Sequence, residues 1–167
     1  VAEGRDILVP RLVHRAREIP GVELVMWRVG DEAVIASATA ELHFAPAAVQ
    51  HADAPRWDVD GDLSVVGGSV DDDGAFRSDS HPDALTRAWS ALACPTAGDV
   101  ILSAAPGYEF VDWGGVDHLR GGSHGSLHAS DSLAPLLWCG LDNAPAPDGR
   151  TWSIRDVTPM ALAHFGV

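Results

Sequence analysis

The chain has 167 residues, of which 46% are apolar and 21% charged, and this composition excludes a globally disordered protein. The formal net charge is −13, and such an acidic protein repels a phosphate backbone, which argues against nucleic acid as a partner. No apolar run approaches the roughly 20 residues of a transmembrane helix, so the sequence predicts a soluble chain without a membrane span and leaves its compartment unknown.

The first third of the chain predicts a helix followed by antiparallel strands. Apolar residues recur at helical spacing over residues 5–19, which predicts a helix that either begins near Pro10 or bends there. Alternation over residues 22–28 predicts a strand, and Gly30-Asp31 predicts the turn that follows it. Residues 33–44 then predict the returning strands of a β-meander.

Residues 46–80 are rich in Pro, Gly and Asp, and they predict one short strand at Leu63–Val66. The stretch "DVDGD" suggests a calcium loop, but an EF-hand needs glycine at its sixth position and glutamate at its twelfth. Counted from Asp58, these positions hold Leu63 and Ser69. We therefore interpret "DVDGD" as an exposed turn, and "DDDG" at 71–74 as another.

The second half predicts two helices and several short strands. Ser80 and Asp83 form a capping-box pattern before a helix that Pro95 ends. An apolar run at residues 100–104 predicts a buried strand, and shorter strands are expected at residues 108–111 and in "LAPLLWCG". A final helix is expected after Asp156 as N-cap, with Gly166 as its C-terminal cap.

The two cysteines give neither a disulfide framework nor a CxxC metal motif. Cys94 lies in "SALACP" and Cys139 in "LLWCG", and both surroundings are apolar. Unpaired cysteine behaves as a small apolar residue, so the sequence predicts two buried free thiols.

Most of the histidines show no spacing that is typical of a site. Asp117 and His118 form either a metal-binding pair or a simple hydrogen-bonded pair, and the residues do not decide between these. His14 and His164 lie on predicted helices, and we interpret them as surface or packing residues; His43, His51 and His81 show no recognisable spacing. No serine occupies the G-x-S-x-G elbow of a hydrolase nucleophile.

The stretch "RGGSHGSLHASDS" at residues 120–132 combines glycine, serine and two histidines. His124 and His128 would share one face of a helix, but the three glycines at 121, 122 and 125 favour a loop. Glycine in such a loop lets the backbone approach a ligand closely. His124 is therefore a candidate functional residue, and a purely structural role stays open at this point.

Three segments stand in the order "GDVILSAAPGYEF", "GGSHGSLHASDSLAPLLWCG" and "IRDVTPMALAHFGV" within residues 98–167. Together they resemble the C-terminal end of the alkaline phosphatase superfamily, in its type I phosphodiesterase/nucleotide pyrophosphatase-like branch. The resemblance implies a metal-dependent hydrolase of small phosphate esters, with two divalent metals, usually zinc, at one edge of a mostly parallel sheet. By motif, His124 occupies a metal-ligand position, whereas His128 and Asp131 are not assigned as ligands.

The other functional parts of that family are missing from this sequence. There is no "SDHG"-like motif, no nucleophile motif and no Asp-x-x-x-His pair, and Asp117-His118 lies too close to His124 and lacks a following glycine. A catalytic zinc takes three protein ligands, so one imidazole cannot hold it. Together with the start at Val1, this predicts a C-terminal fragment of a longer hydrolase that is inactive by itself, and we assign no catalytic residue.

The resemblance sets the expected fold and partners. We expect an α/β fold in which residues 98–167 give a partly parallel sheet with flanking helices, while residues 1–97 form an antiparallel β-rich accessory segment. The expected partners are a small phosphate ester and the remainder of the parent chain, and a homodimer would cover an exposed sheet edge. The alternative is a stand-alone, non-catalytic α/β domain that binds a ligand or a protein through a surface rich in its six tryptophans.

Overall fold

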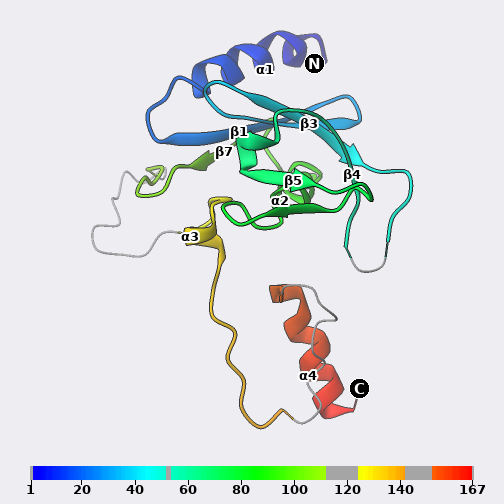
Figure 1. Cartoon of the computed structure of the whole chain (residues 1–167). Coiled ribbons are helices and arrows are strands. Elements are labelled where there is room, and N and C mark those ends of the chain that lie inside the picture. The colour runs from blue at the N-terminus through cyan, green and yellow to red at the C-terminus, as the bar shows by residue number, and fades with distance from the viewer. Residues whose placement is uncertain (1, 52–53, 112–123, 142–151, 167) are drawn as a thin grey trace. The chain divides into compact units, whose positions relative to one another are not determined.

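A computed structural model describes residues 2–51, 54–111, 124–141 and 152–166 of the chain. These residues form two compact units, which comprise residues 1–133 and residues 134–167. The first unit is built around a five-stranded sheet with the strand order β4-β3-β2-β1-β7 (Figure 1). Among the described residues, no helix is both long enough and apolar enough to cross a bilayer.

The predicted helix and meander are confirmed. Helix α1 (Ala2–Ala16) contains Pro10 inside it, so the helix neither begins nor ends at the proline. Four strands follow and pair antiparallel in chain order: β1 (Val22–Val29), β2 (Glu32–Ala36), β3 (Glu41–Pro46) and β4 (Trp57–Gly61). Gly30 adopts a φ of 58° in the hairpin between β1 and β2, which is the left-handed conformation that glycine accepts at little cost.

The predicted partly parallel α/β fold is wrong, because every strand pair among the described residues is antiparallel. Strand β7 (Val100–Ala104) is the apolar run that we expected in a parallel sheet, and it pairs antiparallel with β1 at the sheet edge. Helices cover both faces of this sheet. When both faces of a sheet are covered, its strands are mostly apolar whether they run parallel or antiparallel. The sequence of such a strand therefore does not show its direction.

The side chains of the central strands alternate between the two faces of the sheet, except at the start of β1. On the α1 face, Val25 and Trp27 of β1 and Val34 and Ala36 of β2 pack with residues of α1. On the α2 face, the core is larger and includes the following strand residues: Leu24, Met26, Ala33, Ile35, Leu42, Phe44 and Trp57. Helix α2 (Ala84–Leu92) covers this second face, on the side opposite α1 (Figure 1).

The segment between β4 and α2 contains short elements. The predicted strand at Leu63–Val66 is wrong, because these residues form the 3₁₀ helix η1. The Asp62 side chain accepts a hydrogen bond from the amide of Ser64 and so caps this helix, while Gly67 ends it at a φ of 52°. A two-stranded ribbon of β5 (Gly68–Val70) and β6 (Phe76–Ser78) follows, with the predicted turn at residues 71–74 between its strands.

Helix α2 is present, but the predicted capping box is not. Asp83 precedes the helix at a φ of 55° and its side chain makes no capping hydrogen bond. The Ser80 hydroxyl instead lies 3.0 Å from Nδ1 of His81. The turn predicted at "DVDGD" is wrong, because residues 58–61 belong to the edge strand β4 and Asp62 caps η1. The three aspartates are exposed as predicted.

The strands expected after β7 are also wrong. Residues 108–111 and 133–140 contain no strand, and Pro135 in the second stretch has no amide hydrogen to donate to a neighbouring strand. Between them lies the short helix α3 (Ala129–Ser132). In the second unit, η2 (Ile154–Asp156) leads into α4 (Val157–Phe165), and Gly166 caps that helix at a φ of 69° as predicted.

The cysteines and tryptophans differ from the sequence expectation. Cys94 and Cys139 are free but exposed, so the prediction of buried thiols is wrong. Trp57 packs in the core of the α2 face with Phe44 and the half-buried Trp89, at ring-centroid distances of 5.4 Å and 6.0 Å from Trp57. In the first unit, these tryptophans therefore contribute mainly to the core and not to a recognition surface.

Candidate functional site

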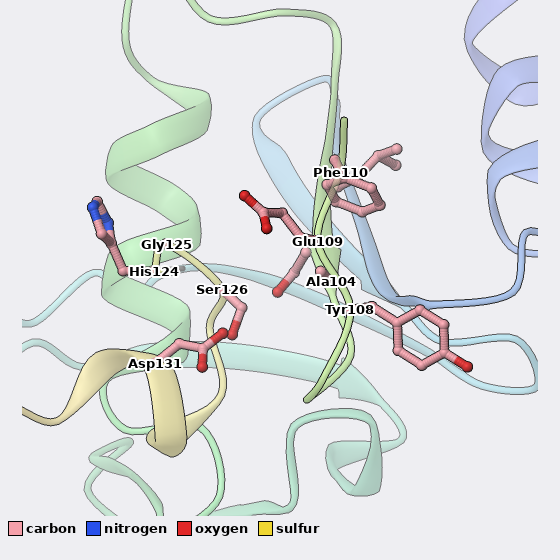
Figure 2. Close-up of a pocket in the computed structure, with 10 residues that line it drawn as sticks. Ala104, Tyr108, Glu109, Phe110, His124, Gly125, Ser126 and Asp131 are labelled. Atoms are coloured by element: carbon pink, nitrogen blue, oxygen red, sulfur yellow. The ribbon is translucent and has the colours of Figure 1, made fainter. Parts of the chain in front are cut away.

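A pocket of about 370 Å³ lies where the chain leaves β7, and the loop around His124 forms its opposite wall. Three segments line it: Leu102–Ala104, Tyr108–Phe110 and His124–Ser126; Asp131 of α3 completes the lining. Figure 2 shows the aromatic residues Tyr108 and Phe110 on one side and His124 on the other. Parts of "GYEF" and of "SHGSLHASD" therefore meet in one cavity.

The wall after β7 is fixed by a tight turn against β1. The amide of Ala105 donates to the carbonyl of Gly21 at 2.8 Å, and the amide of Tyr108 donates to the carbonyl of Ala105 at 3.0 Å. The Tyr108 ring lies over Gly21, whose φ is 88°, and any side chain at position 21 would collide with that ring. Glycine at this position therefore allows Tyr108 to reach the pocket.

The loop that carries His124 is anchored in the core of the α2 face. Gly125 has a φ of 111°, which glycine adopts readily, and Ser126 and Leu127 that follow are buried. The Leu127 side chain belongs to the hydrophobic cluster of the α2 face, and its amide donates to the hydroxyl of Ser103 on β7 at 2.9 Å. His124 thus lies three residues before a fixed point of the fold.

His124 itself is exposed at the edge of the pocket. Its imidazole points away from Ser126 and Asp131 (Figure 2). Within the described residues, no three side chains of His, Cys, Asp or Glu are placed to hold a metal ion together. Glu109 and Asp131 line the same pocket and offer oxygen donors, but with His124 they do not form a complete metal site.

The described lining of the pocket carries two carboxylates, those of Glu109 and Asp131. No arginine of the described part of the chain lines it. The Ser130 hydroxyl donates to Oδ1 of Asp131 at 3.2 Å, which holds that carboxylate near the loop. A phosphate group would be repelled by such a pocket, so it would enter only together with cations that offset the carboxylates.

His128 has a structural role in the same loop. It is the N-cap of α3, and its Nδ1 accepts a hydrogen bond from the amide of Ser130 at 3.2 Å. The ring also packs edge-on against His81, with 5.3 Å between the ring centroids. Asp117 and His118, the other pair singled out in the sequence, lie outside the described residues.

The pair of the buried His81 and the half-buried Glu23 next to this loop was not predicted from the sequence. His81 is 6% exposed, and its Nε2 lies 3.2 Å from Oε1 of Glu23, within ion-pair distance but not aligned as a hydrogen bond. A β-bulge between Val22 and Leu24 takes Glu23 out of the paired register. Strict alternation would not predict this placement, so the pattern of β1 could not reveal the pair.

The remaining histidines are consistent with surface positions. His14 lies 3.7 Å from Glu18 on the exposed side of α1, and His43 lies 3.2 Å from Glu32 across the edge of β2 and β3. His51 and His164 are exposed. None of these side chains lines the pocket.

Comparisons of the chain with protein-family models, with curated proteins and with solved structures find no match. The case for a function therefore depends on the resemblance of the motifs and on the geometry of the pocket.

Proposed function

We propose that this chain is part of a metal-dependent phosphohydrolase of the phosphodiesterase/nucleotide pyrophosphatase type. In this proposal His124 supplies one imidazole ligand to a divalent metal, most simply zinc, and the pocket beside it forms part of the substrate site. The other ligands and the nucleophile would come from residues outside the described part of the chain. The isolated chain would then be inactive.

The position of His124 is the observation that carries this proposal. The imidazole is exposed at the mouth of a cavity, on a glycine-containing loop whose next residues are buried. An imidazole held in this way is accessible to a metal without a change in the backbone. A histidine with only a packing role would be expected to lie beneath apolar side chains, as Leu127 does three residues later.

The described residues fit a metal only in part. Imidazole and carboxylate are the donors that zinc accepts, but no three of them converge. A bound metal would supply the positive charge that a phosphate ester needs in this acidic pocket. The residues of this chain would hold the imidazole at the rim and shape the walls with Tyr108 and Phe110.

The test compares His124→Ala with the unchanged protein in the complete reading frame that encodes this sequence. We expect bound zinc, measured by elemental analysis, to fall, and hydrolysis of bis(p-nitrophenyl) phosphate to drop by about 100-fold or more. Loss of a residue that only supports a metal ligand already costs about 10- to 100-fold. His51→Ala is the control, because His51 is exposed and does not line the pocket.

Two results would contradict the proposal. Zinc content and turnover that are unchanged in His124→Ala would remove the assigned ligand. Zinc-dependent turnover by residues 1–167 alone would show that the chain is not a fragment that requires additional ligands.

A further inference from the structure

We propose that Arg87 of α2 is a positioning residue for the pocket, because its guanidinium holds the loop that carries His124 and Asp131. NH2 of Arg87 donates to the carbonyl of Ser126 at 2.8 Å. NH1 donates to the carbonyl of Leu127 at 3.1 Å and to the hydroxyl of Ser132 at 2.7 Å. These partners lie 39 to 45 residues away in the sequence, so one side chain joins α2 to the far wall of the site.

The chemistry of arginine suits this role. A guanidinium presents five hydrogen-bond donors in a rigid plane, so it can serve adjacent carbonyls and a hydroxyl at the same time. Lysine would offer a single ammonium group, which cannot present donors in the same fixed plane to all three acceptors. Burial lowers the pKa of Arg87 and the nearby Asp83 charge raises it, but arginine stays protonated throughout the physiological range.

The loop contacts of Arg87 follow His124 in the sequence and lie on both sides of Asp131. Ser126 follows His124 by two positions, and Ser132 directly follows Asp131. The Ser132 hydroxyl donates to the carbonyl of His128 at 2.7 Å and lies 3.1 Å from the carbonyl of Ser126, so one hydrogen is shared between two acceptors of the same loop. Arg87 therefore holds residues 126–132, the segment that connects His124 to Asp131 and continues past it, in one conformation.

Other anchors would remain if Arg87 were removed. The amide of Leu127 is held by Ser103, and the amide of Ala129 donates to the carbonyl of Ser80 at 2.7 Å. The Leu127 side chain stays in the core. A change at Arg87 is therefore expected to free the carbonyl side of the loop while the sheet and α2 stay folded, so the effect should be local.

The first experiment measures amide hydrogen exchange in residues 124–133 of the full chain, with Arg87→Met against the unchanged protein. Local opening of the loop would no longer have to break the Arg87 bonds, although the other anchors remain. We therefore expect exchange at Leu127, Ala129 and Leu133 to become about tenfold faster or more, while amides of β1 and β2 keep their rates. Arg77→Met is the matched control, because Arg77 is an exposed arginine on β6. Unchanged exchange in the loop of Arg87→Met would overturn the proposal.

A second measurement separates positioning from general stabilisation. The His124 ring resonance, assigned with His124→Gln, should shift in Arg87→Met but not in Arg77→Met. Added guanidinium ion should restore part of the exchange protection in Arg87→Ala, and Arg87→Lys should restore less than arginine gives. If Arg87→Met slows or speeds exchange equally in the loop and the sheet, Arg87 only stabilises the fold and the proposal fails.

The importance of this loop for a metal rests on the proposed function. A zinc titration distinguishes a failure of the proposed function from a failure of the role proposed for Arg87. The probe is Zn²⁺ added to the protein that the complete reading frame encodes, followed through the His124 ring signal. If Zn²⁺ perturbs that signal, Arg87→Met should require several times more Zn²⁺ for the same effect. If Zn²⁺ leaves the signal of that unchanged protein unaltered, the proposed function fails, and the hydrogen exchange still decides the role of Arg87.

Discussion

The two faces of the sheet bury similar kinds of side chain but support different things. The α1 face is covered by one helix. Strand β3 contributes no residue to the apolar cluster under this helix, and on this face it carries Glu41 and His43, which we call the polar margin. The α2 face holds a larger core, which includes three aromatic rings and Leu127 from the pocket loop.

This difference shows how the fold supports a site. On the α1 face, burial of apolar side chains stabilises the sheet, and the polar margin borders the buried region. On the α2 face, the same apolar burial also fixes a distant loop, because Leu127 enters the core while Ser103 and Arg87 hold its backbone. The pocket wall that this loop forms is therefore anchored in the core of the α2 face, and changes on the two faces should have different consequences.

The largest effect is expected from an aromatic residue of the α2 face. Phe44→Ala should lower the free energy of unfolding by about 3–5 kcal/mol, because Phe44 is 1% exposed and its removal leaves a cavity between Trp57 and Trp89. Val13→Ala on the α1 face removes only two methyl groups, about 1.6 kcal/mol. Urea unfolding of both variants measures this, and equal losses would show that the faces do not differ in this way.

The next effect links the core to the pocket. Leu127→Ala should cost about 2–3 kcal/mol, because Leu127 is 6% exposed in the α2 core. Leu133→Ala, with a side chain that is 63% exposed, should stay within about 0.5 kcal/mol. Urea unfolding gives both values. A loss at Leu127 that does not exceed the loss at Leu133 would mean that the loop is not anchored by burial.

A smaller effect is expected from the hydroxyl beneath the loop. Ser103→Ala leaves the buried amide of Leu127 without its acceptor, which should cost about 1–2 kcal/mol. Ser69→Ala on β5 is the control, because Ser69 is exposed. Thermal unfolding of both proteins tests this, and a water molecule that replaces the hydroxyl would reduce the difference to near zero and weaken the comparison.

The smallest effect belongs to the polar margin of the α1 face. The Arg17 guanidinium pairs with Glu41, and its Nε donates to the carbonyl of Ser37 at 2.6 Å. The pair is partly exposed, so a double-mutant cycle of Arg17→Met and Glu41→Gln should give a coupling energy of about 0.5–1 kcal/mol that decreases with added salt. A coupling energy as large as the loss of unfolding free energy in Leu127→Ala would show that the Arg17–Glu41 pair contributes as much to stability as a buried core residue.

Local pattern was enough to predict the meander and the helices α1, α2 and α4, but not η1 or α3. Alternation in β1 and the glycine turn after it specify a hairpin, and the helical spacing before them specifies α1. Strand direction was not predictable, because β7 is apolar for the same reason as a strand of a parallel sheet: both faces of its sheet are covered. The apolar stretch around Leu137 resembled a strand, but it has no strand partner among the described residues.

The site was predictable only at its most visible residue. The glycine and histidine pattern indicated His124, which does line a pocket, while its role as a ligand stays a prediction. Ser103 and Arg87 were missed because a single polar residue on a strand or a helix has no periodic signature, and their partners are 24 to 45 residues away. The contact of Glu23 with His81 depends on a bulge that alternation cannot reveal.

The aromatic cluster of the α2 face also gives the protein an optical reporter. Trp57 and Trp89 have ring centroids 6.0 Å apart and planes inclined by 60°, an arrangement in which the electronic transitions of two indoles couple. Trp27 belongs to the opposite face and takes no part in this pair. Circular dichroism of the coupled indoles would therefore follow the packing of the core of the α2 face separately from the packing under α1.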